Sequence, residues 1–196
     1  MIRVAIVGDI GSGKTYISKL FGYPLFNADF EVSKIYKKDK NCYQKIKTQF
    51  PKLNFSFPLQ KQQLTKCILS NPNNLKKLSK IVHPIVRKKL NLFLKKNRNK
   101  KIIILDIPLY FENKINLKND IVIFVQAKKE EIKKRLQRRK EYSSKLLKIF
   151  KKIQLPLDVK KRRSNFIIKN NFSNNSVKKA LKYILNQIKK NDRSRT

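Results

Sequence analysis

Ile2-Arg-Val-Ala-Ile-Val-Gly-Asp-Ile-Gly-Ser-Gly-Lys-Thr-Tyr16 is the stretch that decides the fold of this chain. The apolar run Ile2 to Val7 predicts a buried strand. It leads directly into Gly8-Asp-Ile-Gly-Ser-Gly-Lys-Thr15, which matches the phosphate-binding pattern G-x-x-x-x-G-K-[ST] at every fixed position. A helical spacing of apolar residues follows from Ile17 to Phe21. Strand, loop and helix therefore stand in the order that the pattern requires.

Each part of this loop has a chemical reason. Glycine lets the backbone curl around an anion with its N–H groups turned inward, and three of the chain's 4 glycines lie here. The helix that follows adds N–H donors and the positive end of its dipole. Lys14 would reach the β- and γ-phosphates, and the Thr15 hydroxyl would bind Mg²⁺. The sequence thus predicts a nucleoside triphosphate site made by Gly8, Gly11, Ser12, Gly13, Lys14, Thr15 and Tyr16.

Composition bounds the class of protein. With 196 residues, 40% of them hydrophobic, the chain can hold one full domain and a smaller appendage. Cys42 and Cys67 show neither metal-ligand spacing nor a disulfide framework, which predicts ordinary packing in a reducing cytoplasm. No apolar run approaches the ~18 residues of a membrane helix, so neither a membrane partner nor an N-terminal signal is expected.

The formal net charge of +37 would attract polyanions, nucleic acid included. The excess is mostly lysine and is spread from end to end, as an A+T-rich genome would impose on any protein surface. We therefore expect non-specific adhesion at low salt and no specific nucleic-acid partner. A monomer or a weak homo-oligomer is expected.

Asp29 is the first acid beyond the loop, and it lies just past a short predicted strand, Pro24 to Asn27. In an open α/β sheet, ligands bind at the carboxyl ends of the strands, where the phosphate loop also lies. An acid there can bind Mg²⁺ through water or take a proton from an attacking hydroxyl. The alternative is an N-cap for the helix that begins near Phe30, and the two roles can coexist.

Residues 30–97 have a helical and rather polar pattern, too long for a simple crossover between strands. They predict a helical substrate-binding lobe, whose longest stretch runs from Leu75 to Leu94. This stretch contains His83-Pro84-Ile-Val-Arg87, where Pro84 predicts a kink or a new helix start. Judged by residue type alone, His83 is a capping or packing residue and Arg87 a surface charge.

Lys101 to Asp106 predicts a third strand, buried on both faces and ending in an acid. This is the Walker B arrangement, in which Asp106 holds the magnesium shell. The chain then leaves through Pro108 into an apolar lip that carries Glu112, which by residue type alone either grips a substrate or caps a helix. A fourth strand is predicted over Asp120 to Val125.

Lys129 to Arg139 predicts a helix with Arg135 and Arg139 four residues apart on one face. Paired arginines near a nucleotide site suit a lid that clamps phosphates, and a solvated basic face is the equal alternative. Gln154-Leu-Pro156 ends the next helix.

The chain closes with a strand over Phe166 to Ile168, a helix over Val177 to Ile188 and a frayed tail from Asn191. Alternating strands and helices predict an α/β fold, a parallel sheet with helices on both faces and two insertions.

Taken together, these stretches resemble the dephospho-coenzyme A kinase family over nearly the whole chain. The phosphate loop is shared by many kinases, whereas two stretches in this order and spacing are far more specific: His83-Pro-Ile-Val-Arg87 and Asp106-Ile-Pro-Leu-Tyr-Phe-Glu112. The likeness also covers Asn27-Ala-Asp29, Arg135 with Arg139, Gln154-Leu-Pro156 and Ile168 to Asn170.

The resemblance implies ATP-dependent phosphorylation of the ribose 3′-hydroxyl of dephospho-coenzyme A, with Mg²⁺. It implies a P-loop kinase core, a coenzyme-binding helical lobe and a helical lid, with ATP and dephospho-coenzyme A as the small-molecule partners. By resemblance, Asp29 is the catalytic acid, the two lid arginines clamp phosphates, and Asn170 lies near the adenine pocket. His83, Arg87, Pro108 and Glu112 become substrate-side residues.

The predicted core covers residues 1–29, 101–128 and 164–190, the lobe 30–100 and the lid 129–163. The chain departs from the family's usual residues at Asn27, Ser33, Ile132 and Asn165. The rivals are another small-molecule kinase with the same loop, acting on nucleosides or their monophosphates, and a nucleic-acid-binding ATPase.

Overall fold

The computed structural model describes residues 1–139 and 142–193, the last three by their backbone alone. It divides into two compact units. We call the first the sheet unit, which comprises Met1–Phe26, Asn99–Tyr142 and Gln154–Thr196. We call the second the helical unit, which comprises Asn27–Arg98 and Ser143–Ile153.

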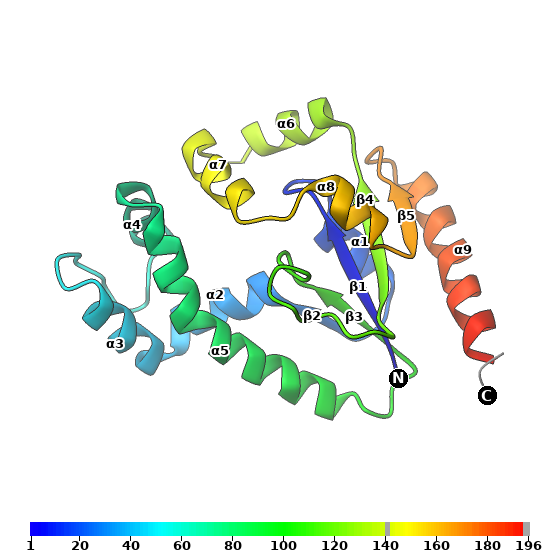
Figure 1. Ribbon diagram of the computed structural model, residues 1–196, viewed down its shortest axis with the longest axis horizontal. Coiled ribbons are helices and arrows are strands. Elements are labelled where there is room, and N and C mark those ends of the chain that lie inside the picture. The colour runs from blue at the N-terminus through cyan, green and yellow to red at the C-terminus, as the bar shows by residue number, and fades with distance from the viewer. Residues whose placement is uncertain (140–141, 194–196) are drawn as a thin grey trace. The chain divides into compact units, whose positions relative to one another are not determined.

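The sheet has five strands in the order β2-β3-β1-β4-β5 (Figure 1). β1 pairs in parallel with β3 and β4, and β4 pairs in parallel with β5. The strands are β1 (Ile2–Gly8), β2 (Leu25–Asn27), β3 (Ile102–Asp106), β4 (Ile121–Gln126) and β5 (Phe166–Lys169). The predicted parallel α/β sheet is thus confirmed, with each strand bound within two residues of its expected position.

Both faces of the sheet are covered, because the central strands bury the residues that point to one face as well as those that point to the other. On one face, Val4, Ile104 and Ile123 pack into a core with α1 (Lys14–Leu20) and α9 (Asn174–Arg193). On the other face, Ala5, Ile103 and Phe124 are also buried. Such strands give the continuous apolar runs that the sequence displays. Two further helices complete this unit, α6 (Lys129–Gln137) and α8 (Leu157–Arg162).

The helical unit is built from amphipathic helices around its own core. The helices are α2 (Ala28–Lys38), α3 (Lys40–Gln49), α4 (Lys61–Ser70), α5 (Asn73–Lys96) and α7 (Ser144–Lys152). Ile35, Ile46 and Leu78 are among the buried residues that join these helices. α7 lies within the predicted lid range 129–163, yet it groups with this unit, whereas α6 and α8 group with the sheet unit.

The two cysteines belong to the core of the helical unit. Both are free, and Cys42 is 0% and Cys67 1% exposed. Burial raises the pKa of the Cys42 thiol to about 11, and burial also raises the pKa of Cys67. The expectation of ordinary packing is confirmed.

Four local expectations need correction. Asn27, not Asp29, caps α2, because its side-chain oxygen accepts a hydrogen bond from the Phe30 N–H at 2.7 Å. α5 runs through Pro84 as one helix, so of the two alternatives, a kink or a new helix start, the new start is wrong. α6 ends at Gln137, so Arg139 lies in the turn beyond the helix rather than within it. α9 begins at Asn174 and continues to Arg193, which places residues 191–193 in the helix; 194–196 lie outside the described residues.

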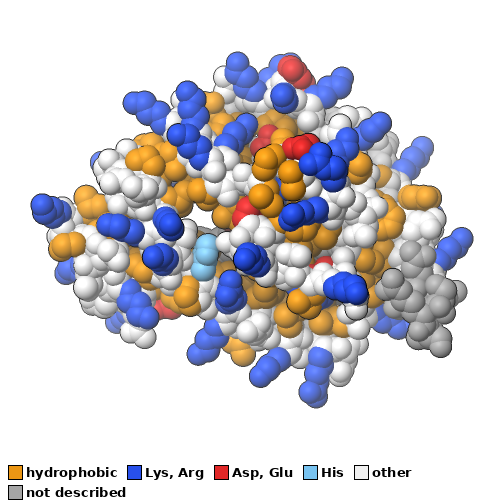
Figure 2. All heavy atoms as spheres, viewed as in Figure 1, with side chains coloured by type: hydrophobic (Ala, Val, Ile, Leu, Met, Phe, Trp, Pro, Cys, Tyr) orange, Lys and Arg blue, Asp and Glu red, His pale blue; other side chains and the backbone are white. Residues whose placement is uncertain are grey.

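Lys and Arg side chains are distributed over the visible surface rather than gathered in one stripe (Figure 2), as expected for a chain with 49 of them against 12 acids. Among the described residues, no helix is both long and apolar enough to cross a membrane.

Candidate active site

The phosphate loop joins β1 to α1 at the carboxyl edge of the sheet. Its three glycines, Gly8, Gly11 and Gly13, all have positive φ angles, of 148°, 87° and 93°. A β-carbon at Gly8 would lie 2.5 Å from the backbone oxygen of Val125, so the loop can approach β4 only because this residue has no side chain. The local chain direction is therefore set by the glycines.

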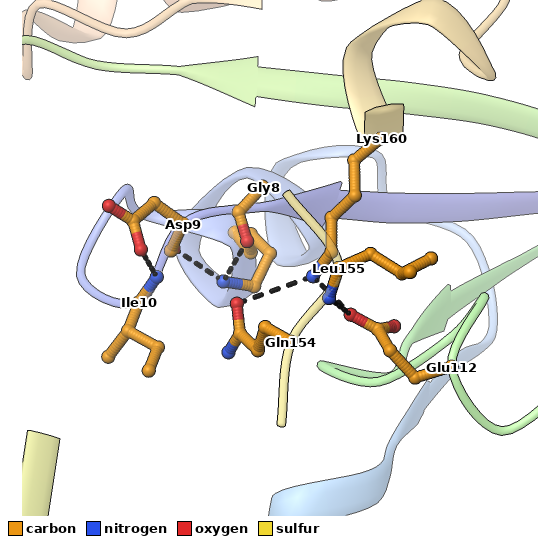
Figure 3. A network of polar contacts seen from close by, with 8 residues as sticks. Gly8, Asp9, Ile10, Glu112, Gln154, Leu155 and Lys160 are labelled. Atoms are coloured by element: carbon orange, nitrogen blue, oxygen red, sulfur yellow. Dashed lines mark hydrogen bonds and ion pairs between the residues drawn. The ribbon is translucent and has the colours of Figure 1, made fainter. Parts of the chain in front are cut away.

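The side chain of Lys14 folds back onto the phosphate loop. Its Nζ donates hydrogen bonds to the backbone oxygens of Gly8, at 3.2 Å, and Asp9, at 2.7 Å. Asp9 in turn accepts the Ile10 N–H through its carboxylate at 2.7 Å (Figure 3). Lys14 is 9% exposed. Its ammonium is held within the curl of the loop, where it would meet the terminal phosphates of a bound nucleotide.

Thr15 and Asp106 meet at the ends of two neighbouring elements. The Thr15 hydroxyl donates to Oδ2 of Asp106 at 2.6 Å, and Asp106 is 2% exposed. β3 pairs directly with β1, so its carboxyl end arrives beside the start of α1. A hydroxyl and a carboxylate oxygen are the protein ligands that Mg²⁺ takes alongside phosphates and water, so the two side chains fit that ion.

Asn170 links the last strand to the same loop. Its Nδ2 donates to the Ser12 backbone oxygen at 2.8 Å, and its own N–H donates to the oxygen of Gln126 at 2.7 Å. The residue is 4% exposed, and its Oδ1 accepts the N–H of Phe172 at 2.9 Å. Asn170 thus joins the end of β5 to the phosphate loop through hydrogen bonds.

Arg135 is exposed on α6, and its guanidinium lies 4.3 Å from the centre of the Phe172 ring. Arg139 is exposed in the turn after α6, where its N–H donates to the oxygen of Leu136. Tyr16 projects outward from α1, with 43% exposure, and its hydroxyl contacts the side chain of Asn174.

Glu112 is engaged in a buried network that the residue pattern did not reveal. Its Oε1 forms an ion pair with Lys160 Nζ at 2.7 Å and accepts the Leu155 N–H at 2.8 Å (Figure 3). Lys160 also donates to Oε1 of Gln154 at 3.3 Å and is 1% exposed. The network fixes the Gln154-Leu-Pro156 stretch to the segment after β3, in which Pro108 is half-buried. One buried lysine gives no recognisable signal in a chain with 49 basic residues.

Asp29, His83 and Arg87 belong to the helical unit. Asp29 is exposed in the first turn of α2, directly after β2. A groove of about 640 Å³ follows one face of α5, lined by Lys80, His83, Pro84, Arg87, Lys88, Asn91, Leu92 and Lys95. Burial lowers the pKa of His83, and the positive charge of Arg87 adds to the effect. The groove is therefore cationic through its lysines and arginine, with a neutral imidazole at neutral pH.

Comparison with known proteins gives this arrangement a family. The family model described as dephospho-CoA kinase matches residues 2–190. A dephospho-CoA kinase from Wolbachia of Brugia malayi is 32% identical over 190 residues, covering 94% of this chain and 97% of the relative. The chain belongs to the dephospho-CoA kinase family. It is accordingly a phosphotransferase that uses ATP.

Solved structures share the fold of this chain. A crystal structure from Thermus thermophilus superposes with a TM-score of 0.73 at 26% identity, covering 95% of this chain and 97% of that one. Dephospho-CoA kinase from Campylobacter jejuni has a TM-score of 0.63 at 23% identity, with 97% and 98% covered, and supports the fold. The predicted parallel sheet with helices around it is thereby confirmed.

Three of the four residues expected to depart from the family pattern have local structural roles in this chain. Asn27 caps α2, as described above. Ile132 packs on the phosphate loop, with its Cγ2 3.1 Å from where a β-carbon of Gly11 would lie. Asn165 fixes the start of β5 to β4, because its Oδ1 accepts the Val122 N–H and its own N–H donates back, both at 2.8 Å. Ser33, exposed on α2, has no role that the structure explains.

Proposed function

We propose that this kinase transfers the γ-phosphoryl group of ATP to the ribose 3′-hydroxyl of dephospho-coenzyme A, giving coenzyme A and ADP. The observation that carries the proposal is the Thr15–Asp106 hydrogen bond of 2.6 Å beside the loop-bound Lys14, within a chain matched to the family from residue 2 to 190. A phosphate loop beside a strand that ends in an acidic residue is the arrangement with which P-loop enzymes bind a nucleoside triphosphate and its magnesium ion.

The phosphate loop would bind the triphosphate through its N–H groups, and the Lys14 ammonium would neutralise charge on the transferred group. Arg135 and Arg139 would add positive charge around the same oxygens. Thr15 and Asp106 would hold Mg²⁺, which when bound neutralises phosphate charge. Asn170, fixed to Ser12, would border the adenine.

Asp29 would orient the 3′-hydroxyl and accept its proton as the new oxygen–phosphorus bond forms and the bond to the β-phosphate oxygen breaks. The groove on α5 supports a role in acceptor binding, because the substrate's phosphates would meet Arg87 and the lysines of that face, with His83 among them. Pro108 and Glu112 would complete the acceptor side, and the buried pair with Lys160 would hold Glu112 in place.

The test is an ADP-release assay with dephospho-coenzyme A beside a panel of nucleosides and nucleoside monophosphates, with the product identified by mass. We expect turnover with dephospho-coenzyme A and little with the panel. Preference for a nucleoside or its monophosphate would overturn the acceptor assignment. The assay is repeated with DNA and RNA present, and we expect no stimulation, since we propose that the basic surface carries no specific nucleic-acid site.

We also propose that the enzyme acts in the cytoplasm, without a membrane partner, as a monomer or weak homo-oligomer. Two buried free cysteines with raised thiol pKa values support a reducing compartment. Sedimentation at several concentrations would test the oligomeric state.

A further inference from the structure

Phe172 has a backbone conformation that its residue type disfavours. It follows β5 and Asn170, with φ of 63°, in the left-handed region where a bulky side chain is strained. Its N–H donates to Asn170 Oδ1 at 2.9 Å, which fixes the backbone there. Strain of this kind persists where the surroundings determine the conformation, and it gathers at functional sites. The conformation of Phe172 therefore indicates a functional role for its ring.

The ring connects the phosphate loop to Arg135. Its Cε1 lies 3.6 Å from where a β-carbon of Gly13 would be, so one part of the ring borders the loop. The Arg135 guanidinium carbon lies 4.3 Å from the ring centre, which is a cation–π contact. Two short contacts therefore lead from the loop to the guanidinium.

The backbone of Arg135 is fixed independently. Ile132 and Leu136, one turn of α6 around it, both pack on Gly11, with atoms 3.0 to 3.1 Å from where its β-carbon would lie. The helix is thereby seated on the phosphate loop, and the remaining freedom lies in the exposed Arg135 side chain. A long exposed side chain samples many rotamers, and holding it in one of them costs entropy.

We propose that Phe172 is a positioning residue for nucleotide binding, whose ring holds the Arg135 guanidinium beside the phosphate loop before ATP arrives. The inference rests on the proposed role of Arg135 at the triphosphate. Because the rotamer is already selected, ATP does not have to order the arginine when it binds. Phe172 acts through Arg135 and makes no bond with the reacting atoms.

The test compares Phe172→Leu, which keeps an apolar side chain without a π face, with Phe172→Tyr, which keeps the ring. We expect Phe172→Leu to raise both the Kd for ATP and the KM for ATP about two- to fivefold. kcat at saturating ATP should change less than twofold, because the bound triphosphate then orders the arginine itself. Phe172→Tyr should retain the wild-type Kd.

Two further variants separate positioning from a structural role. In an Arg135→Ala background, Phe172→Leu should leave the Kd for ATP unchanged, since the residue through which the ring acts is gone. Phe172→Gly relieves the positive φ and should show the same raised Kd as Phe172→Leu, without loss of thermal stability relative to Phe172→Leu. Tyr183→Leu, at a 62% exposed aromatic position on α9, is the matched control and should bind ATP as wild type does.

A wild-type Kd in Phe172→Leu or Phe172→Gly would overturn the proposal, and so would an equal loss in the Arg135→Ala background. Binding of ATP is measured by titration without an acceptor. Failure of dephospho-coenzyme A to react would therefore count against the proposed function and leave this test intact.

Discussion

The sheet unit and the helical unit place functional groups in opposite ways. At the phosphate loop of the sheet unit the candidate groups are short or buried, and backbone geometry positions them: Lys14 bonds to loop carbonyls, and Thr15 meets Asp106. In the helical unit Asp29 is exposed, and a row of long cationic side chains lines an open groove on α5. The phosphate-loop groups are held by these hydrogen bonds before a ligand binds, whereas the lysines of the α5 groove keep side-chain freedom that a ligand must remove.

This difference in preorganisation suits the two units to different ligands. A preorganised loop suits a triphosphate whose charge and geometry are constant. A groove of flexible cations suits a larger acceptor that contacts several side chains at once. Variants in one unit should therefore leave the chemistry of the other unit measurable.

The largest effect is expected at Asp29. Asp29→Asn should lower kcat by roughly 10²–10⁴-fold, the usual range for a positioned base, because the amide cannot accept the proton of the hydroxyl. The Kd for ATP, which depends on the sheet unit, should change little. Steady-state ADP release and ATP titration measure the two quantities. Wild-type turnover would remove Asp29 from the mechanism, and a large loss of ATP affinity would show that the units are not separable in this way.

The next effect concerns stability in the sheet unit. Lys160→Met should lower the free energy of unfolding by about 3–5 kcal/mol, since it leaves the Glu112 carboxylate buried without its partner. Denaturant unfolding measures this quantity. Arg162→Met, on the same helix α8, removes an ion pair whose side chains are 72% and 63% exposed, and it should cost under about 0.5 kcal/mol.

A second variant sharpens the result at this pair. Lys160→Met combined with Glu112→Gln should recover part of the lost stability, because no charge is then left unpaired. Equal stability losses in Lys160→Met and Arg162→Met would show that burial of the first pair carries no energetic weight.

A core substitution in the helical unit should have a somewhat smaller effect. Leu78→Ala, at a 3% exposed position of α5, should lower the free energy of unfolding by about 2–4 kcal/mol through lost burial and a residual cavity. Leu92→Ala, on the same helix at 57% exposure, is the matched control and should be close to neutral. ATP affinity should survive both. A Leu78→Ala variant that stays folded but no longer binds ATP would contradict the independence of the sheet unit.

The smallest effect is the pH dependence contributed by His83. Its pKa is lowered below 6.5 in the folded protein, chiefly by burial and further by Arg87, so the unfolded chain takes up the proton more readily. The contribution of His83 is therefore a loss of stability as the pH falls through 6.5 toward the folded pKa. In His83→Gln the change in unfolding free energy between pH 7.5 and pH 5.5 should be smaller than in wild type.

Because the chain has 1 histidine, the difference between the two titration curves belongs to that side chain. Curves that superpose would show that the imidazole keeps its ordinary pKa in the folded protein.

The sequence predicted most of the sheet unit because its signals are local. Three local signals identify Lys14, Thr15 and Asp106 as candidate site residues. They are glycines at fixed spacing, a buried strand and an acid at a strand end. Strand bounds followed from apolar runs flanked by polar residues. Lys160 could not be found this way, since its burial depends on the distant Glu112, and lysines are too frequent here to stand out.

In the helical unit, periodicity predicted the helices better than their ends. A short side chain one or two residues earlier can cap as well as an aspartate, which is why Asn27 took the place expected for Asp29. In the sheet unit, the end of α6 before Arg139 also left no clear sequence signal, because neither glycine nor proline follows it. That α7 groups with helices far away in the chain depends on tertiary packing alone.

The buried thiols of the helical unit make the natural protein ready for spectroscopic labelling. Maleimides and similar reagents attack the thiolate, which Cys42 and Cys67 scarcely form at neutral pH because both are enclosed and their pKa values are raised. Cysteines introduced by Leu69→Cys and Tyr183→Cys, one in each unit and both at exposed positions, would thus react selectively without prior removal of the native pair. Energy transfer between the two dyes could then follow the units through a catalytic cycle.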